Sequence, residues 1–368
     1  MCKASGPLTV PLLSLTLHCY AARGVDVVQR SGGPARRSGH QPVLHDVAEL
    51  AGVSQMTVSR VLNDTGPVKP DTRKRVLESV QQLGYRPNAL ARGLATGRSR
   101  TLGVVALDSV LHGPASTLLG VENAAREAGY GVSISSVSDP EDSGRAIDVL
   151  RGQCVAGIVV IAPHVRTAQA LADVPGDVPV VAVADTDQAP VPVVAVDQRS
   201  GARLATEHLL ALGHRPVWHV AGPEGWLETE AREQSWRDAL RVRGVPEPPV
   251  LRGDWSPRSG YEAGRELVAH GGVDAVFVAN DQMALGVLRA MAEAGLSVPH
   301  DVRVVGFDDV PEAAYFCPPL TTVRQDFLAL GRKTFEQMLL RMEGGRPVRR
   351  SIVPAELIVR DSTGPGRC

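Results

Sequence analysis

Apolar residues recur at helical spacing in three short stretches near the start of the chain. The first stretch has the stripe of an amphipathic helix, with apolar residues at i, i+3, i+4 and i+7: Leu44, Val47, Ala48 and Ala51. Gly52 ends this helix, and Ser54 is a good N-cap for a second helix that runs to about Leu62. A third helix is predicted over residues 71–83, with Gly84 as its C-cap. Three short helices with a tight turn between the first two predict a helix-turn-helix unit.

The second predicted helix divides into an apolar face and a polar face. Val58, Val61 and Leu62 point toward the other two helices. The opposite face carries one arginine and mostly small polar side chains: Gln55, Met56, Ser59, Arg60 and Asn63. Such a face fits the major groove of DNA, where an arginine can pair with guanine O6 and N7. An ordinary solvated helix face explains the same pattern equally well, so this helix alone leaves both interpretations open.

From Thr101 onward, short valine-rich runs alternate with helical stretches. The predicted strands are 102–107, 131–137, 157–162, 178–184, 193–196, 217–221, 275–279 and 303–307. Near-continuous apolar strands separated by helices are typical of parallel sheets covered on both faces, and a body this long favours two similar lobes. Ligands of such sheets bind beyond the carboxyl ends of the strands, where Asn280–Asp281 and Asp308–Asp309 follow two of them. No glycine-rich phosphate loop is present, so no nucleotide cofactor is predicted.

The first 41 residues show no periodicity that lasts a full helix. Glycine, proline, serine and arginine cluster at 31–39, and we interpret 1–41 as a disordered extension or the product of a start codon placed too far upstream. Leu8–Leu17 is apolar enough to resemble the core of a secretory signal, although no convincing small-residue cleavage site follows it. The helix-turn-helix unit is predicted over 42–86. Residues 87–100 are predicted to form a short helix and linker, followed by the two-lobed body over 101–368.

Charge is distributed unevenly along the chain. Residues 1–100 carry 14 Lys and Arg against 6 Asp and Glu, whereas the remaining residues carry 25 against 34. A basic N-terminal part on an acidic body suggests that this part meets a polyanion such as nucleic acid.

Cysteine usage and hydropathy bear on the compartment. The five cysteines are scattered and form no CxxC pair, which argues against a disulfide framework and a zinc site and favours a reducing compartment. No apolar run reaches the roughly 18 residues that a membrane span needs. We therefore expect a cytoplasmic protein with no membrane segment, no metal and no cofactor.

Several runs of residues together resemble the lactose-repressor family of bacterial transcription regulators. In the N-terminal part these are Asp46–Ser54, Thr57–Asn63 and Gly84–Ala91; in the body they are Ala279–Gly286, Val305–Asp309 and Thr321–Phe327. The resemblance runs from about Val43 to Asp326 and is most specific in the N-terminal part. It implies a helix-turn-helix head, a hinge helix and a two-lobed α/β body like that of periplasmic binding proteins.

The resemblance also assigns DNA-binding roles to individual residues. Gln55 and Met56 occupy the two positions that most vary operator preference, Arg60 that of the base-reading arginine, and Leu94 that of an apolar wedge for the minor groove. Phosphate or backbone contacts, which position the head without specifying sequence, are implied for Thr57, Ser59, Asn63, Lys69, Thr72, Tyr85 and Asn88. A homodimer on a pseudo-palindromic operator is expected.

An effector pocket follows from the same resemblance. Seven residues fall where the founding member of the family lines its sugar pocket: Asp187, Arg232, Trp255, Asn280, Asp308, Gln325 and Phe327. Trp255 offers a flat platform for a sugar ring, and the polar groups suit neighbouring hydroxyls, although Asn280 and Asp308 could instead cap helices. The set favours a small sugar, a galactoside, over a purine.

Other positions depart from the founding member. The pair Gln55–Met56 differs, so the operator should differ, and changes at Leu107 and Thr117 leave the far end of the sugar unassigned. No heptad pattern follows Arg350, which favours a dimer over a tetramer.

The predicted function is a DNA-binding repressor of sugar-utilisation genes that a small sugar releases from its operator. The rival is a secreted, periplasmic-type sugar-binding protein that uses Leu8–Leu17 as its signal and is cleaved near Ala22. That rival leaves residues 43–98 without a purpose. An enzyme is not expected, because no nucleophile–base pairing or metal-ligand spacing is found.

Overall fold

A computed structural model describes residues 42–85, 99–174 and 176–364. The chain divides into two compact units that meet between Arg86 and Pro87. The first unit holds the three N-terminal helices and the second holds the body, and each is described by itself. The predicted hinge helix, with Asn88 and Leu94, and the N-terminal extension lie outside the described residues.

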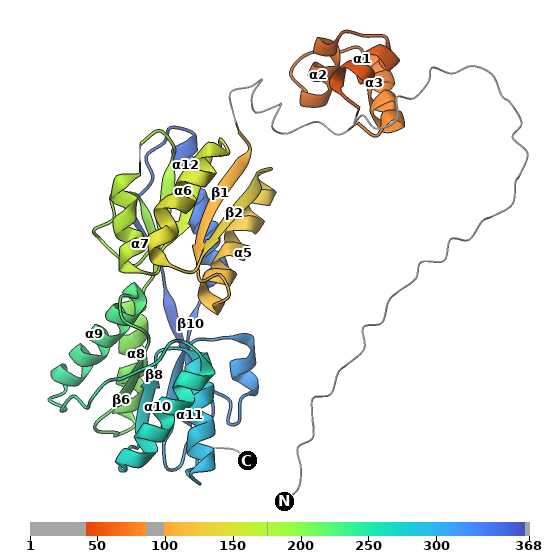
Figure 1. Cartoon of the computed structure of the whole chain (residues 1–368). Helices are drawn as coiled ribbons and strands as arrows, with labels where there is room; N and C mark the ends of the chain where they lie inside the picture. The colour runs from red at the N-terminus through yellow and green to blue at the C-terminus, as the bar shows by residue number, and fades with distance from the viewer. Residues whose placement is uncertain (1–41, 86–98, 175, 365–368) are drawn as a thin grey trace, which may run out of the picture. The chain divides into compact units, whose positions relative to one another are not determined.

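The N-terminal unit, called the head below, is a three-helix bundle of α1 (Leu44–Ala51), α2 (Gln55–Asn63) and α3 (Pro70–Leu83) (Figure 1). Its core is small and aliphatic, and its most buried side chains are Val47, Val58 and Val76. Ser54 caps α2, because its Oγ accepts the Thr57 N–H at 3.2 Å. The three helices lie within about a residue of where the periodicity predicts them.

The first lobe of the body is built on a six-stranded parallel sheet in the order β11-β5-β4-β3-β1-β2. The strands are β1 (Thr101–Leu107), β2 (Gly131–Val137), β3 (Gly157–Ile161), β4 (Val180–Val183), β5 (Val193–Val196) and β11 (Arg350–Val353). Helices α5 (His112–Glu127) and α12 (Phe327–Met342) cover one face of the sheet. Helices α6 (Ser143–Gly152) and α7 (Val165–Ala170) cover the other. Both faces are therefore buried, as the continuous valine runs predict.

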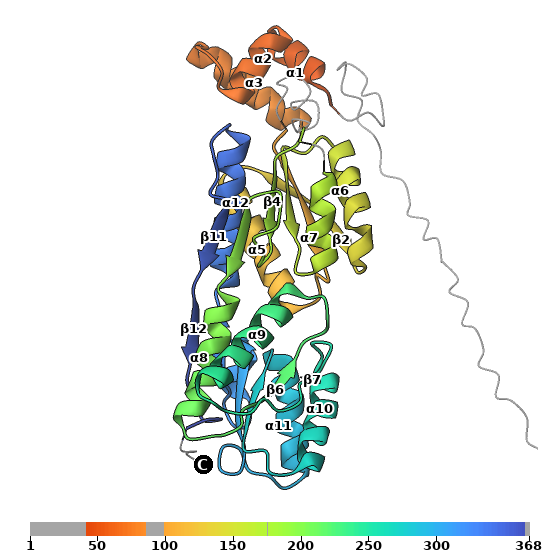
Figure 2. The same ribbon diagram turned by 90° about the vertical axis from the view of Figure 1, so that its left-hand side faces the viewer.

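The second lobe repeats this design with the strand order β12-β10-β9-β8-β6-β7. The strands are β6 (Trp218–Ala221), β7 (Leu251–Arg252), β8 (Ala275–Val278), β9 (Arg303–Asp308), β10 (Thr321–Gln325) and β12 (Ala355–Ile358). Helices α8 (Gln198–Ala211) and α9 (Leu227–Val242) cover one face, and α10 (Pro257–His270) and α11 (Asp281–Glu293) cover the other (Figure 2). The described part of the body also contains short 3-10 turns at Pro140–Asp142, Leu171–Asp173 and Pro311–Tyr315.

Four strands were not predicted, namely β7, β10, β11 and β12. Strand β7 is only two residues long, and the others mix polar with apolar residues instead of forming a continuous apolar run. The expectation of purely parallel sheets is wrong for the second lobe, because β12 pairs antiparallel with β10 at the edge of the sheet.

The chain passes between the lobes at three places: from β5 to α8, from β10 to α12, and from β11 to β12. A direct backbone bridge adds a fourth link near the carboxyl ends of the strands. The Val165 N–H donates to the Gly225 carbonyl at 2.9 Å, and the Leu227 N–H donates to the Pro163 carbonyl at 2.8 Å. These links hold the carboxyl ends of the two sheets toward one another.

Within the described ranges, every helix is too short or too polar to span a lipid bilayer.

Candidate functional site

A cavity of about 320 Å³ lies between the two lobes. Its lining includes residues at or just beyond the carboxyl ends of strands of both sheets, among them Ile161, Asp185 and Gln198 on one side and Asn280, Asp308 and Gln325 on the other. This is where ligands of open α/β sheets bind. The volume is at the lower end of the range for small-molecule sites, which suits one or two sugar rings.

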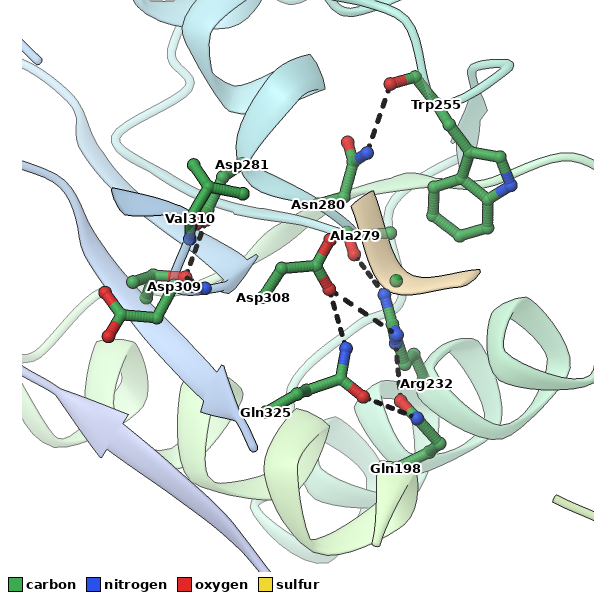
Figure 3. Close-up of polar contacts among 12 residues, drawn as sticks. Gln198, Arg232, Trp255, Ala279, Asn280, Asp281, Asp308, Asp309, Val310 and Gln325 are labelled. Atoms are coloured by element: carbon green, nitrogen blue, oxygen red, sulfur yellow. Dashed lines mark hydrogen bonds and ion pairs between the residues drawn. The ribbon is translucent and has the colours of Figure 1, made fainter. Parts of the chain in front are cut away.

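A connected set of polar side chains forms one wall of the cavity (Figure 3). Arg232 of α9 donates from Nε to Gln198 Oε1 at 2.8 Å and from Nη1 to the Ala279 carbonyl. Gln198 in turn donates to Gln325 Oε1 at 2.8 Å, and Gln325 donates to Asp308 Oδ1 at 2.6 Å. Each member fixes the orientation of the next, so the wall is rigid before any ligand arrives.

The central ion pair of this wall is Arg232 with Asp308, whose Nη2 and Oδ1 atoms lie 3.9 Å apart. Arg232 is only 4% exposed, and its guanidinium lies 3.9 Å from the centroid of the Phe307 ring. Burial raises the pKa of Asp308, and the attraction of Arg232 offsets part of that rise. Two of the arginine's donor atoms are already committed to protein acceptors, so its direct capacity for sugar hydroxyls is smaller than the sequence suggested.

Backbone strain is found at two of the predicted pocket residues. Trp255 has φ 72° and Asp308 has φ 113°, a region that side chains other than glycine rarely adopt. Such strain costs about 1–3 kcal/mol per residue and is concentrated at ligand-binding sites. The strained backbone at Trp255 and Asp308 therefore supports a role for both side chains in ligand binding.

Asn280 both lines the cavity and caps a helix. Its Oδ1 accepts the Met283 N–H at 2.9 Å at the start of α11, and its Nδ2 donates to the Trp255 carbonyl at 3.1 Å and to Gln282 Oε1 at 3.0 Å. The capping interpretation of Asn280 is thus correct, and the residue also anchors the loop that carries Trp255.

Asp281, beside Asn280, is buried under the sheet and does not belong to the cavity lining. It accepts the Thr322 hydroxyl at 2.6 Å and the Val310 N–H at 2.9 Å (Figure 3). Burial raises its pKa well above the usual value, and nearby Asp308 raises it further. Asp281 therefore links the start of α11 to strand β10 and to the loop that follows β9.

Six of the seven predicted pocket residues line the cavity: Arg232, Trp255, Asn280, Asp308, Gln325 and Phe327. Asp187 does not join them. Its side chain is 77% exposed and pairs with Arg350 at 2.5 Å, outside the cavity. Asp185, two residues earlier, lines the cavity instead and also pairs with Arg350 at 2.5 Å. The turn after β4 thus places Asp185, and not Asp187, at the carboxyl end of the strand.

Among the other lining residues that the sequence did not indicate are Gln198, Trp226 and Glu228. Asn280 and Asp308 were predicted because ligands bind beyond the carboxyl ends of strands, and the same rule applies here. Gln198 closely follows β5, and Trp226 and Glu228 lie at the start of α9, which follows β6. Thr117 lines the cavity as well, whereas Leu107 is buried in the sheet. Among the residues that the structure describes, no cluster of three or more His, Cys, Asp or Glu side chains could hold a metal ion.

In the head, the predicted base-reading residues Gln55, Met56 and Arg60 share the free face of α2 with two predicted backbone contacts, Ser59 and Asn63. Gln55, Met56, Arg60 and Asn63 are exposed, with Met56 at 66%, and Ser59 is half-buried. Of the predicted backbone-contacting residues, Lys69 is exposed at the start of α3, while Thr57, Thr72 and Tyr85 are half-buried. Tyr85 also packs against the core of the head, a structural role that the sequence reasoning did not give it.

Contacts between side chains orient this face. The Gln55 amide nitrogen lies 3.2 Å from His45 Nδ1 of α1, and Arg60 Nη2 lies 3.5 Å from Met56 Sδ. Asn63 Nδ2 donates to Ser59 Oγ at 3.1 Å. The face therefore presents its amide and guanidinium groups in an ordered row, with no acidic side chain among the residues of α2.

Both units of the chain match models of known protein families. Residues 43–88 match the model of bacterial regulatory proteins of the lacI family, and residues 206–363 match that of the periplasmic binding protein-like domain. The lactose operon repressor of Escherichia coli (strain K12) is 35% identical over 324 residues, which cover 87% of this chain and 90% of that protein.

Solved structures of two similar regulators have the same fold. The lac repressor dimer bound to operator and the anti-inducer ONPF has a TM-score of 0.83 at 34% identity, covering 88% of this chain and 99% of that one. The complex of the transcriptional regulator CelR with cellobiose has a TM-score of 0.66 at 33% identity, covering 87% of this chain and 99% of that one. The identity and coverage include both the head and the body. The chain belongs to the lacI family of bacterial regulatory proteins.

Proposed function

We propose that this protein is a transcriptional repressor of sugar-utilisation genes, released from its operator by a small sugar bound between the lobes. The proposal depends most on one observation: the same chain contains a free polar helix face in the head and a preformed polar cavity in the body. The similarity of the whole chain to a regulator crystallised with cellobiose supports a sugar, and a galactoside remains our first candidate.

In the head, Arg60 reads a guanine, and Gln55 and Met56 set the preference at neighbouring base pairs. Thr57, Ser59, Asn63, Lys69, Thr72, Tyr85 and Asn88 contact the backbone, and Leu94 enters the minor groove. His45 supports this row by restraining the amide of Gln55. Two heads, brought together in a homodimer, then recognise a pseudo-palindromic site.

In the body, Trp255 supports the apolar face of a sugar ring, while Asn280, Asp308 and Gln325 meet its hydroxyls. The polar wall is preformed, so an epimer whose hydroxyl misses its partner leaves a buried group unpaired at a cost of about 1–3 kcal/mol. Phe327, which packs edge-on against His112, closes the opposite side.

Release requires the sugar to prefer a lobe arrangement that the operator-bound dimer does not adopt. Moving a population from 1:99 to 99:1 takes a differential affinity of about 5.5 kcal/mol. The lobes meet at the cavity and at the backbone bridge between Pro163–Val165 and Gly225–Leu227, so a ligand there can bias their arrangement.

Footprinting of the protein on DNA from its own upstream region tests the proposal. We expect a protected, pseudo-palindromic site occupied by two chains, and loss of protection when the right sugar is added. No protected site at protein concentrations that saturate random DNA would contradict the repressor function.

The alternative function, a secreted sugar-binding protein, gives no role to the head. Yet the head matches the lacI family model, and the 35% identity to the lactose operon repressor covers 87% of the chain. Mass spectrometry of the native protein tests this alternative directly, because it requires an N-terminus near Ala22. We propose that no reaction is catalysed and that the protein acts where the chromosome is, in the cytoplasm.

A further inference from the structure

Glu228 is an acidic side chain of the cavity that the sugar-binding account does not use. It stands in the first turn of α9 and lines the cavity, and its Oε2 atom is buried without a hydrogen-bond partner among the described residues. A buried carboxylate oxygen that remains unpaired is costly, so an unpaired one in a binding cavity points to a group that the ligand supplies. Rotation about the last side-chain bond can present either oxygen to the cavity.

The balance of charge around the cavity indicates what that group is. Asp308 is paired with Arg232, and Asp185 is paired with Arg350. Glu228 is the third acid of the lining, and in the part of the chain that the structure describes no cation forms a salt bridge with it. Burial raises the pKa of Glu228 to about 7, and the attraction of Arg232 only partly offsets this rise, which Asp185 and Asp308 reinforce. Glu228 is therefore the acid of the lining that has no cationic partner of its own among the described residues.

Two indole rings line the same cavity as this acid. Trp226, the residue before α9, and Trp255 line the cavity with ring centroids 5.5 Å apart in an edge-to-face arrangement. Trp255 is 6% exposed, and its indole N–H has no partner within the described ranges. Aromatic faces next to a carboxylate attract ammonium groups, and the unpaired N–H requires an acceptor such as a sugar hydroxyl.

We propose that the effector is a sugar that carries a free amino group, held as its ammonium by Glu228 and stacked on the tryptophan pair. This inference rests on the proposed function of the cavity as the sugar site and narrows its ligand to the amino sugars. The same ring with a hydroxyl or an acetylated nitrogen at that position lacks the charge that Glu228 pairs with. An ammonium also lets the carboxylate ionise without leaving an uncompensated charge.

Isothermal titration calorimetry of the full-length protein tests this inference. The ligands are glucose, galactose and cellobiose, each compared with its 2-amino and 2-acetamido counterparts. We expect one 2-amino sugar to bind at least about tenfold more tightly than its neutral counterparts, as a charge-assisted hydrogen bond implies. In Glu228→Gln the ratio of amino-sugar affinity to neutral-sugar affinity should fall to within about threefold.

Glu230→Gln is the matched control, because Glu230 is an exposed acid in the same first turn of α9. It should retain the full preference for the amine. Equal or weaker binding of every amino sugar, or a preference that survives in Glu228→Gln, would overturn the inference.

Operator binding separates this inference from the proposed function. If a neutral sugar binds and releases the operator without any preference for the amine, the inference fails and the repressor function stands. If none of the sugars binds or releases the operator, the inference and the sugar-release part of the proposed function both fail.

Discussion

Arg232 shows how one residue can organise a site without being its main ligand contact. It holds Gln198 and the Ala279 carbonyl, lies on the Phe307 ring, and balances Asp308. The sequence identified Arg232 as a pocket residue because its position resembles the family. It did not predict that the donors would be occupied, because hydrogen bonds between residues distant in sequence depend on the packed structure.

Arg60 is the residue on which operator selectivity depends most. We expect Arg60→Ala to reduce the free-energy preference for operator over random DNA by about 1–3 kcal/mol. Weak non-specific binding should remain. Arg75→Ala, which removes an exposed arginine of α3, is the control and should lower both affinities without changing the ratio. An unchanged ratio in Arg60→Ala would refute the assignment of α2 as the recognition helix.

Glu228 should also make the stability of the ligand-free body depend on pH. Its pKa is about 7 in the folded protein against 4.5 in the unfolded chain, so between these values the unfolded chain holds fewer protons. The free energy of unfolding therefore falls as pH rises from 5 to 7, by about 1–3 kcal/mol through this group, and the loss is complete above pH 7.

Urea unfolding followed by tryptophan fluorescence measures this effect, because all four tryptophans are in the body. Glu228→Gln should lose that part of the pH dependence and gain stability relative to the wild type at pH 8. Identical pH profiles for the two proteins would show that Glu228 does not titrate in this range.

Local sequence patterns predicted most of the helices and strands. The head helices, the valine-rich strands and the polar residues that end β8 and β9 were all predicted from short-range periodicity and capping. The strands β10, β11 and β12 were not, because their residues form neither a continuous apolar run nor a regular alternation, and they gain their stability from pairing with strands far away in sequence. Asp187 was misplaced for a related reason, since the short turn after β4 decides which aspartate faces the cavity.

The backbone bridge between the lobes is an element that the sequence could not indicate. Gly225 has φ 79°, and a Cβ atom there would lie 2.5 Å from His164 Nε2 across the bridge. We expect Gly225→Ala to weaken the bridge and lower effector affinity about five- to tenfold, measured by calorimetry.

Gly244→Ala is the matched control for this change. Gly244 has a similar φ of 63°, but no atom lies within 4 Å of the position of its Cβ. Both substitutions should cost the body about 1 kcal/mol of stability through backbone strain, and only Gly225→Ala should affect the effector. Equal effector affinities in the two variants would show that the bridge does not contribute to ligand binding.

For the whole molecule, the uneven charge predicts how DNA binding responds to salt. Most of the affinity should come from phosphate neutralisation by the basic N-terminal part, so binding should weaken steeply as salt increases. The two-unit organisation and the family were evident from sequence because the head signature is specific. The identity of the sugar was not, because it depends on which side chains from both lobes meet in the cavity.

The most direct test of the central claim is a fluorescence-anisotropy titration of the full-length protein on DNA from its own upstream region, with and without neutral and amino sugars. We expect tight, salt-sensitive binding that one sugar releases. Tight binding that no sugar changes would contradict the effector site, and binding no tighter than to random DNA would contradict the repressor function itself.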